Sequence, residues 1–141
     1  MHNLPPFHIA FPVDNLATAR KFYSGVLGCR EGRSDESWVD FDLYGHQIVP
    51  HLVPDSVQPA KTTNPVDGQK VPVPHFGVIL DWESWTKLVD RLKKSSIEFI
   101  IEPYIRFANQ LGEQATMFLK DPAGNALEFK AFKNLEQLFE K

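Results

Sequence analysis

The chain of 141 residues contains a single cysteine and has no excess of basic residues. Cys29 alone cannot form a disulfide within the chain, which fits a reducing compartment. The net charge of −3 gives no basic face for a phosphate backbone, so we expect no nucleic-acid partner. Lys93 and Lys94 form the one obvious basic pair, and a solvated helix end accounts for them.

Long apolar segments are also missing. No apolar run approaches the roughly 20 residues that a membrane-spanning helix needs. Residues 1–6 lack both the positive region and the apolar core of a signal peptide. We therefore expect a cytoplasmic protein without a membrane partner. The length suits one domain, residues 1–141, and a hydrophobic content of 43% is ordinary for a globular protein that can bury a core.

An internal repeat dominates the pattern of apolar residues. Each half predicts the order strand, helix, strand, strand, strand. The first half places these elements at residues 7–13, 15–28, 29–34, 37–44 and 46–53. The second half places them at residues 73–80, 81–95, 98–107, 114–120 and 125–132. Asn15 and Asp81 are suitable N-caps for the two helices, and Gly28 is a suitable stop for the first.

This order predicts an α+β fold of two βαβββ modules. A four-stranded sheet with its helix on one face leaves the other face uncovered. Two such mixed sheets can cover each other by curling into an open barrel around a central cavity. Module 1 would span about residues 6–53 and module 2 about residues 74–132.

Two further segments lie outside the modules. The connector, residues 54–73, holds four prolines and shows no periodicity. It is either a functional loop or a linker packed over the surface or against a partner chain. Residues 134–141 predict a short amphipathic C-terminal helix that docks on a neighbouring surface, since short helices are marginal alone.

Three polar residues stand out because they lie within apolar strands. Alternation places His8 beside Ala10, and His75 beside Gly77, on the faces opposite the large apolar side chains. Glu128 also leaves the large apolar face of its strand. Burying such groups costs free energy unless they gain partners. Two imidazoles and one carboxylate entering one cavity would hold a divalent metal and leave other coordination positions open.

A structural alternative exists for each of these residues. Either histidine could be a hydrogen-bonded structural residue, and Glu128 could pair with Lys130 or with a histidine. The equivalent positions of His8 and His75 in the two halves favour the metal. Two imidazoles and one carboxylate suit Fe(II), and also Mn(II), Ni(II) or Zn(II), since intrinsic affinity does not choose among them.

The motifs resemble a known superfamily. They are Phe-His-Ile-Ala-Phe-Pro-Val at residues 7–13, Phe-Tyr-x-x-x-Leu-Gly at 22–28, Pro-His-Phe-Gly-Val at 74–78 and Asp-Pro-Ala-Gly-Asn-Ala-Leu-Glu at 121–128. Together they resemble the vicinal oxygen chelate superfamily, which includes glyoxalase I, extradiol ring-cleaving dioxygenases and fosfomycin or bleomycin resistance proteins. Within it the chain is most similar to small predicted extradiol dioxygenases. The resemblance implies paired βαβββ modules and assigns the metal to His8, His75 and Glu128.

The resemblance also implies a function. We expect a metal-dependent enzyme, first an extradiol dioxygenase that opens a catechol-like substrate with dioxygen. A glyoxalase-like lyase or isomerase, or a thiol transferase, could use the same metal site. The third alternative is a resistance-type protein that binds a small molecule without turnover. A homodimer is expected, because relatives pair and the connector would permit exchange of halves.

His51 is the candidate acid–base residue. It shares a strand face with Gln47 and Val49. It could move protons during ring opening, supply a fourth metal ligand as in glyoxalase-like relatives, or be a rim histidine without a role. In glyoxalase I the slot near Val49 would favour an acidic or amide side chain, whereas this chain has valine.

Four residues are candidates for substrate contact, and they lie near the ends of strands. Arg106 could pair with a substrate carboxylate, although a surface arginine would explain it as well. The set consists of Gln47, Tyr104, Arg106 and Phe107.

Overall fold

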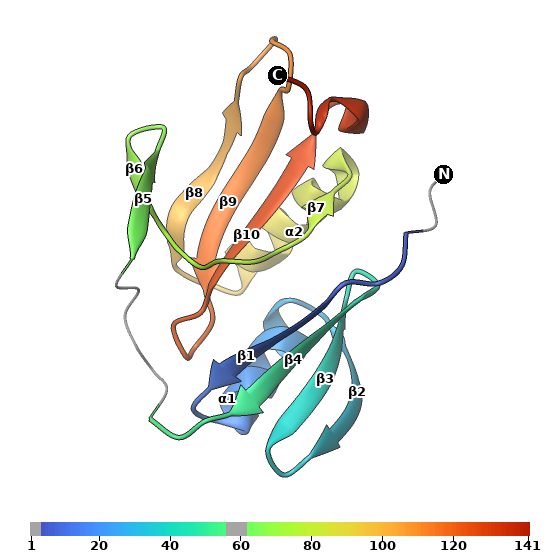
Figure 1. Cartoon of the computed structure of the whole chain (residues 1–141), viewed down its shortest axis with the longest axis vertical. Coiled ribbons are helices and arrows are strands. Elements are labelled where there is room, and N and C mark those ends of the chain that lie inside the picture. Colours follow the sequence, from blue (N-terminus) through green and yellow to red (C-terminus); the bar gives the residue numbers. More distant parts are fainter. Residues whose placement is uncertain (1–3, 56–61) are drawn as a thin grey trace. The chain divides into compact units, whose positions relative to one another are not determined.

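The computed structural model describes residues 4–55 and 62–141, which form two compact units (Figure 1). The first unit comprises the described residues up to 55 together with Asp121–Asn125. The second comprises the remaining described residues from 62 onward. Each unit has a four-stranded mixed sheet with a helical segment packed against it, and the second unit also contains a two-stranded sheet and a 3-10 turn. No helix of the described residues is long and apolar enough to cross a membrane.

The first unit has the predicted order of elements. They are β1 (His8–Val13), α1 (Leu16–Arg20), the π-helix η1 (Lys21–Val26), β2 (Arg30–Asp35), β3 (Trp38–Leu43) and β4 (His46–Leu52). The sheet order is β1-β4-β3-β2, with β1 parallel to β4 and the other pairs antiparallel. The predicted strands and the helix start are therefore confirmed to within one or two residues.

The first helix begins as α and continues as π. The Asn15 side chain accepts a hydrogen bond from the Thr18 amide and caps the start, as predicted. At the far end the Leu27 amide bonds the Phe22 carbonyl at 2.9 Å, the five-residue spacing of a π turn. Gly28 then takes φ of +78°, a left-handed conformation that glycine adopts at little cost and that ends the helix.

The core of the first unit lies between its helical segment and its sheet. The residues that fill it are almost fully buried: Phe11, Val13, Phe22, Tyr23, Val39, Phe41, Leu43 and Ile48. The Tyr23 hydroxyl donates to Oδ2 of Asp121 at 2.7 Å. Asp121 also accepts from the Ala123 and Asn125 amides, so its turn is tied to this unit. Burial raises the pKa values of both Tyr23 and Asp121.

The second unit repeats the same topology. Its elements are β5 (Thr63–Val66), β6 (Gln69–Pro72), β7 (Ile79–Leu80), α2 (Trp82–Lys94), β8 (Phe99–Arg106), β9 (Gln114–Lys120), β10 (Ala126–Phe132) and a 3-10 turn, η2 (Leu135–Gln137). The main sheet has the order β7-β10-β9-β8, with β7 parallel to β10. The Asp81 side chain caps α2 by accepting from the Ser84 amide. Helix α2 buries one apolar face, and its Trp85 indole donates to the Phe129 carbonyl.

The predicted strand at 73–80 is shorter than expected, with only Ile79–Leu80 forming β7. Pro74 has no N–H to contribute to a ladder. The segment nevertheless runs along β10: the Phe76 amide bonds the Ala126 carbonyl, and the Glu128 amide bonds the Phe76 carbonyl at 2.8 Å. His75 is therefore still held beside the last strand.

The connector contains regular structure that its sequence pattern did not predict. Strands β5 and β6 pair as an antiparallel hairpin. Its two turn residues, Asp67 and Gly68, have φ of +49° and +77°, the combination of a type I′ turn. Residues 56–61 of the predicted connector lie outside the described residues.

The predicted C-terminal helix over residues 134–141 is wrong. The segment forms only the 3-10 turn Leu135–Gln137, and the side chains of Leu135 and Phe139 are 61% and 89% exposed. Eight residues are too few for a helix that packing does not support. The Gln137 side chain is bonded to the Gly112 amide instead.

The observed architecture is thus a mixed α+β fold of two modules of equal topology. This part of the prediction is confirmed. The curling of the two sheets into an open barrel around a cavity, and the assignment of residues 1–141 to one domain, stay predictions.

Candidate metal centre

Two of the three predicted metal ligands are neighbours in the second unit. Nε2 of His75 lies 3.2 Å from Oε1 of Glu128. The close approach of the two backbones depends on Gly77, where a Cβ atom would lie 1.6 Å from the Glu128 carbonyl oxygen. The sequence therefore places glycine where the segment that carries His75 meets the strand that carries Glu128.

The other ring nitrogen of His75 is already engaged. Nδ1 lies 2.6 Å from the Pro72 carbonyl oxygen. Because a carbonyl can only accept, Nδ1 carries the hydrogen and Nε2 of the neutral ring keeps its lone pair. The Phe118 ring contacts the imidazole edge-on, with centroids 4.9 Å apart. The ring is therefore oriented with the nitrogen that can bind a metal directed toward Glu128.

The Glu128 carboxylate is held in a similar way. Its Oε2 accepts a hydrogen bond from the Thr116 hydroxyl at 2.5 Å. Thr116 is 2% exposed and lies on β9, the strand paired with β10. Lys130 approaches the same oxygen only at 3.9 Å. Oε1 is therefore the oxygen that remains available next to His75.

His8 shows the same arrangement in the first unit. The register of β1 and β4 sets Gln47 opposite His8, and Nδ1 of His8 lies 2.6 Å from Oε1 of Gln47. An amide oxygen is an acceptor, so Nδ1–H donates and Nε2 keeps its lone pair. Gln47, predicted as a substrate contact, thus also orients the imidazole of His8.

These three contacts are of the kind that supports metal ligands. In each candidate ligand a hydrogen bond holds the atom that would not coordinate, which is the usual support of metal-binding histidines and carboxylates. Two imidazole nitrogens and one carboxylate oxygen suit Fe(II), Mn(II), Ni(II) or Zn(II). Within the described ranges no three His, Cys, Asp or Glu side chains form a cluster that could hold a metal ion. The meeting of all three predicted ligands at one ion stays a prediction.

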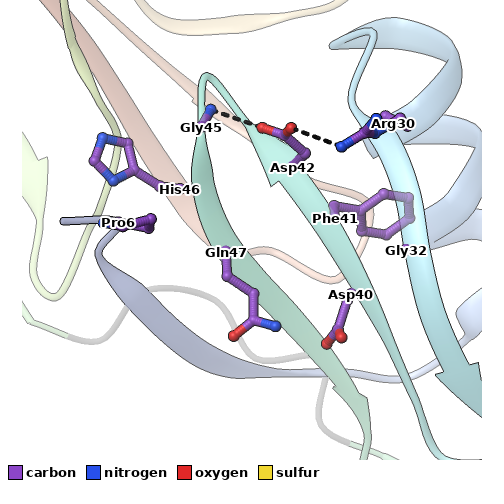
Figure 2. A pocket seen from close by; sticks show the side chains of 9 residues that line it. All are labelled: Pro6, Arg30, Gly32, Asp40, Phe41, Asp42, Gly45, His46 and Gln47. Carbon is purple, nitrogen blue, oxygen red and sulfur yellow. Dashed lines mark hydrogen bonds and ion pairs between the residues drawn. The ribbon is translucent and has the colours of Figure 1, made fainter. Parts of the chain in front are cut away.

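A depression of about 260 Å³ lies on the first unit (Figure 2). Asp42 on its wall accepts from the Gly45 amide at 2.6 Å and pairs with Arg30 at 3.6 Å. Asp40 extends from β3 into this region, near Gln47 of β4, as Figure 2 shows. The residues that line the depression are Pro6, Arg30, Gly32, Asp40, Phe41, Asp42, Gly45, His46 and Gln47.

His51 is exposed on β4, opposite Trp38 of β3 and Pro12 of β1. Alternation puts it on the same strand face as Gln47 and Val49, as predicted. In the part of the chain that the structure describes, its imidazole has no hydrogen-bond partner.

Two predicted substrate contacts are bonded to the turn of the hairpin. The Tyr104 hydroxyl and the Arg106 Nε donate to Oδ2 of Asp67 at 2.7 and 2.6 Å, and Arg106 Nη2 donates to Oδ1 at 3.2 Å. These bonds lower the pKa of Asp67, while burial and Asp67 raise the pKa of Tyr104 to about 12. The Arg106 side chain is only 18% exposed, so it is not an ordinary surface arginine.

Phe107 directly follows Arg106, with φ of +54° and an exposed ring 4.8 Å from the Arg106 guanidinium.

Three residues that support the predicted site residues were not predicted from the sequence: Asp67, Pro72 and Thr116. Asp67-Gly68 was a readable signal, because Asp-Gly is a preferred type I′ turn. A threonine on a buried strand and a proline carbonyl carry no comparable sequence signal.

Comparisons with known proteins agree with this topology. A family model described as Glyoxalase/Bleomycin resistance protein/Dioxygenase superfamily matches residues 6–129. Among curated proteins there is no significant match. A solved glyoxalase/bleomycin resistance protein/dioxygenase from Alicyclobacillus acidocaldarius is 29% identical, with a TM-score of 0.81 over 98% of this chain and 100% of that chain.

Two more distant structures share the fold. The fosfomycin resistance protein FosX from Listeria monocytogenes is 19% identical, with a TM-score of 0.68 over 97% of this chain and 98% of that chain. A glyoxalase/dioxygenase from Nostoc punctiforme is 18% identical, with a TM-score of 0.63 over 90% of both chains. At these identities the similarity concerns the fold and not the reaction.

Proposed function

Because the chain belongs to the Glyoxalase/Bleomycin resistance protein/Dioxygenase superfamily, we propose that it is a metal-dependent enzyme that acts on a small molecule. In this proposal His8, His75 and Glu128 bind one divalent metal ion. One observation supports it most strongly: in both imidazoles Nδ1 lies 2.6 Å from an acceptor oxygen, which leaves Nε2 of each ring for a metal.

The first reaction we propose is extradiol cleavage of a catechol-like substrate. Dioxygen breaks the ring bond adjacent to the two hydroxylated carbons, and both of its oxygen atoms enter the product. When bound, the metal, with Fe(II) favoured, supplies the site at which a chelating substrate and dioxygen are activated. His51 would remove and return the substrate proton, for which its exposed, unbonded imidazole is suited.

A second candidate is a lyase, isomerase or thiol transferase that acts on an anionic chelating molecule. Tyr104 and Arg106 show that this face can hold a carboxylate, but both are bonded to Asp67 and would bind a substrate anion only in its place. Tyr104 lies opposite Thr116, and Thr116 bonds Glu128, so these side chains share one face of the sheet. FosX, whose fold is similar, is named as a fosfomycin resistance protein, and fosfomycin is therefore a suitable probe. Non-catalytic binding of a small molecule is the third candidate.

The test begins with metal-free protein that is loaded anaerobically with Fe(II), Mn(II), Ni(II) or Zn(II). Fe(II)-dependent oxygen uptake with a panel of catechols and a yellow ring-fission product would support the first reaction. Metal-dependent turnover of fosfomycin or of a thiol adduct, without oxygen uptake, would support the second. Tight ligand binding that needs no metal and gives no turnover would contradict both and leave the third.

His51→Gln separates the three roles considered for this residue. Loss of turnover with unchanged metal affinity supports an acid–base role, and weaker metal binding supports a fourth ligand. If neither changes, His51 is a rim residue. The proposal also includes a homodimer. Light scattering coupled to size-exclusion chromatography would detect it as a mass near twice 16.1 kDa.

A further inference from the structure

We propose that the β5–β6 hairpin is a positioning arm for His75, anchored on the sheet by Asp67. Asp67 is thereby a positioning residue of the metal site, although it lies at the far end of the hairpin from His75. The inference rests on the proposed function in one respect, the role of His75 as a ligand. The β5–β6 hairpin belongs to the same compact unit as His75 and Glu128.

The anchor is a carboxylate held by two side chains of β8. Arg106 binds Asp67 with Nε and Nη2, one to each carboxylate oxygen, and Tyr104 adds its hydroxyl. A two-point contact between guanidinium and carboxylate fixes direction as well as distance. The turn of the hairpin is therefore fastened over β8, and Figure 1 shows β5 and β6 beside this strand.

The second part of the arm is an apolar contact along β6. Val71 is 2% exposed and packs with Ile101 and Phe118, which are 4% and 3% exposed. A two-stranded hairpin of four residues per strand is marginal by itself. It holds its place because this contact and the Asp67 anchor act at two points along its length.

The arm ends where it meets the imidazole. Strand β6 ends at Pro72, whose carbonyl accepts a hydrogen bond from Nδ1–H of His75 at 2.6 Å. Phe118, which Val71 covers, is also the residue whose ring contacts the imidazole. Of the three contacts that orient His75, the one with the Pro72 carbonyl comes from the hairpin and the one with Phe118 comes from a side chain that packs against it; the third is with Glu128 on β10. If the anchor is released, Nδ1 loses its fixed acceptor and the ring can take the other tautomer.

The experiment compares Asp67→Asn and Asp67→Ala with Lys70→Ala, an exposed residue of the same hairpin. Asn-Gly is the preferred pair for a type I′ turn, so Asp67→Asn keeps the turn and removes the charge and one acceptor oxygen of the anchor. If Asp67→Ala does not fold, Asp67→Asn carries the test. The first readout is the tautomer of His75 in metal-free protein, taken from its ¹⁵N chemical shifts at pH 8. The second is the Kd of Mn(II) measured by calorimetry.

We expect the Nδ1–H tautomer of His75 to dominate in the parent protein and in Lys70→Ala, and to fall in both Asp67 variants. We expect Mn(II) binding to weaken about 10-fold in Asp67→Asn, the usual effect of losing an outer support of a ligand. An unchanged tautomer in both Asp67 variants would overturn the inference. So would an unchanged Kd in the two variants.

The two readouts also separate this inference from the proposed function. If the parent protein does not bind Mn(II), or binds it equally well as His75→Ala, the proposed metal site fails. The tautomer of His75 in the metal-free protein would still report whether Asp67 orients the ring. A purely structural anchor would lower the melting temperature of Asp67→Asn without moving the tautomer.

Discussion

The Nε2 atom of His75 and the Oε1 atom of Glu128 lie 3.2 Å apart, and each belongs to a group whose other polar atom is already bonded. This relationship is built from separate parts of the second unit. Gly77 permits the backbone approach, Pro72 fixes the imidazole, and Thr116 fixes the carboxylate. The pair is the part of the proposed metal site that one compact unit supplies.

The Thr116 hydroxyl should matter for metal affinity more than for folding. Thr116→Val keeps the shape of the side chain and removes the donor to Glu128 Oε2. We expect metal affinity to fall about 10-fold, because the carboxylate loses its orienting bond. Calorimetry with Mn(II) measures the change. Thr116→Ser, which retains the hydroxyl, is the control, and equal affinities for the valine and serine variants would contradict the prediction.

Gly77 should not tolerate a side chain. Gly77→Ala places a Cβ atom 1.6 Å from the Glu128 carbonyl oxygen, so the segment that carries His75 must move away from β10. We expect a loss of about 3 kcal/mol or more in the free energy of unfolding, since two backbones have to separate. Gly25→Ala is the matched control, because nothing lies within 4 Å of its added Cβ. Urea unfolding that gave similar values for both variants would rule this account out.

The buried bond between Tyr23 and Asp121 should stabilise the first unit. Tyr23→Phe removes the hydroxyl that donates to Asp121 at 2.7 Å and leaves the aromatic packing in place. A hydrogen bond to a charged group contributes about 1.5–3 kcal/mol. We expect a loss in this range, measured by urea unfolding at pH 7. A variant as stable as the parent would show that the bond contributes nothing.

Asp121 should also make the stability depend on pH. Burial raises its pKa in the folded protein, and this outweighs the hydrogen bonds from Asn125 and Tyr23, which lower it. The folded state then keeps the proton at pH values where the unfolded chain, with a carboxyl pKa of about 3.9, has released it. The free energy contributed by this group is therefore greatest below about pH 4 and declines as the pH rises through the folded pKa.

The side chain introduced by Asp121→Asn does not titrate. The variant therefore lacks the contribution of Asp121 to the pH dependence of the free energy of unfolding. The variant should be less stable at every pH, because its amide nitrogen would replace Oδ2, the oxygen that accepts from the Tyr23 hydroxyl and from Nδ2 of Asn125. Between pH 4 and pH 7 its free energy of unfolding should decline less steeply than that of the parent. Urea unfolding across this range measures both slopes, and a steeper decline in the variant would contradict the sign argued here.

Most of the fold could be predicted because the periodicity of the apolar residues and the positions of the capping and turn residues indicated the same elements. Alternation marked the strands, Asn15 and Asp81 marked the helix starts, and the second half repeated the first. The hairpin was missed because Pro65 and Pro72 obscured its strands, although Asp67-Gly68 marked its turn. The C-terminal helix was predicted from spacing alone, without the buried surface that such a short helix requires.

The sequence predicted the candidate metal ligands, but it did not predict the residues that orient them through hydrogen bonds. His8, His75 and Glu128 stood out as polar residues inside apolar strands. Thr116 supports Glu128 across a strand pair, and such a partner depends on register, which the sequence leaves open. Pro72 acts through its carbonyl oxygen, a group that every residue has. Arg106 was predicted to contact substrate, and only the structure showed that Asp67 is its partner.

The most direct test is the metal stoichiometry and affinity of His8→Ala, because His75 and Glu128 are already neighbours. His46→Gln is the control. In the parent protein the Phe7 amide donates to Nδ1 of His46, and the glutamine side chain retains an acceptor for this bond. One divalent metal per chain in the parent and in His46→Gln, with at least 100-fold weaker binding in His8→Ala, is the result predicted for a shared three-ligand site. Equal metal content and affinity in the parent and in His8→Ala would contradict it.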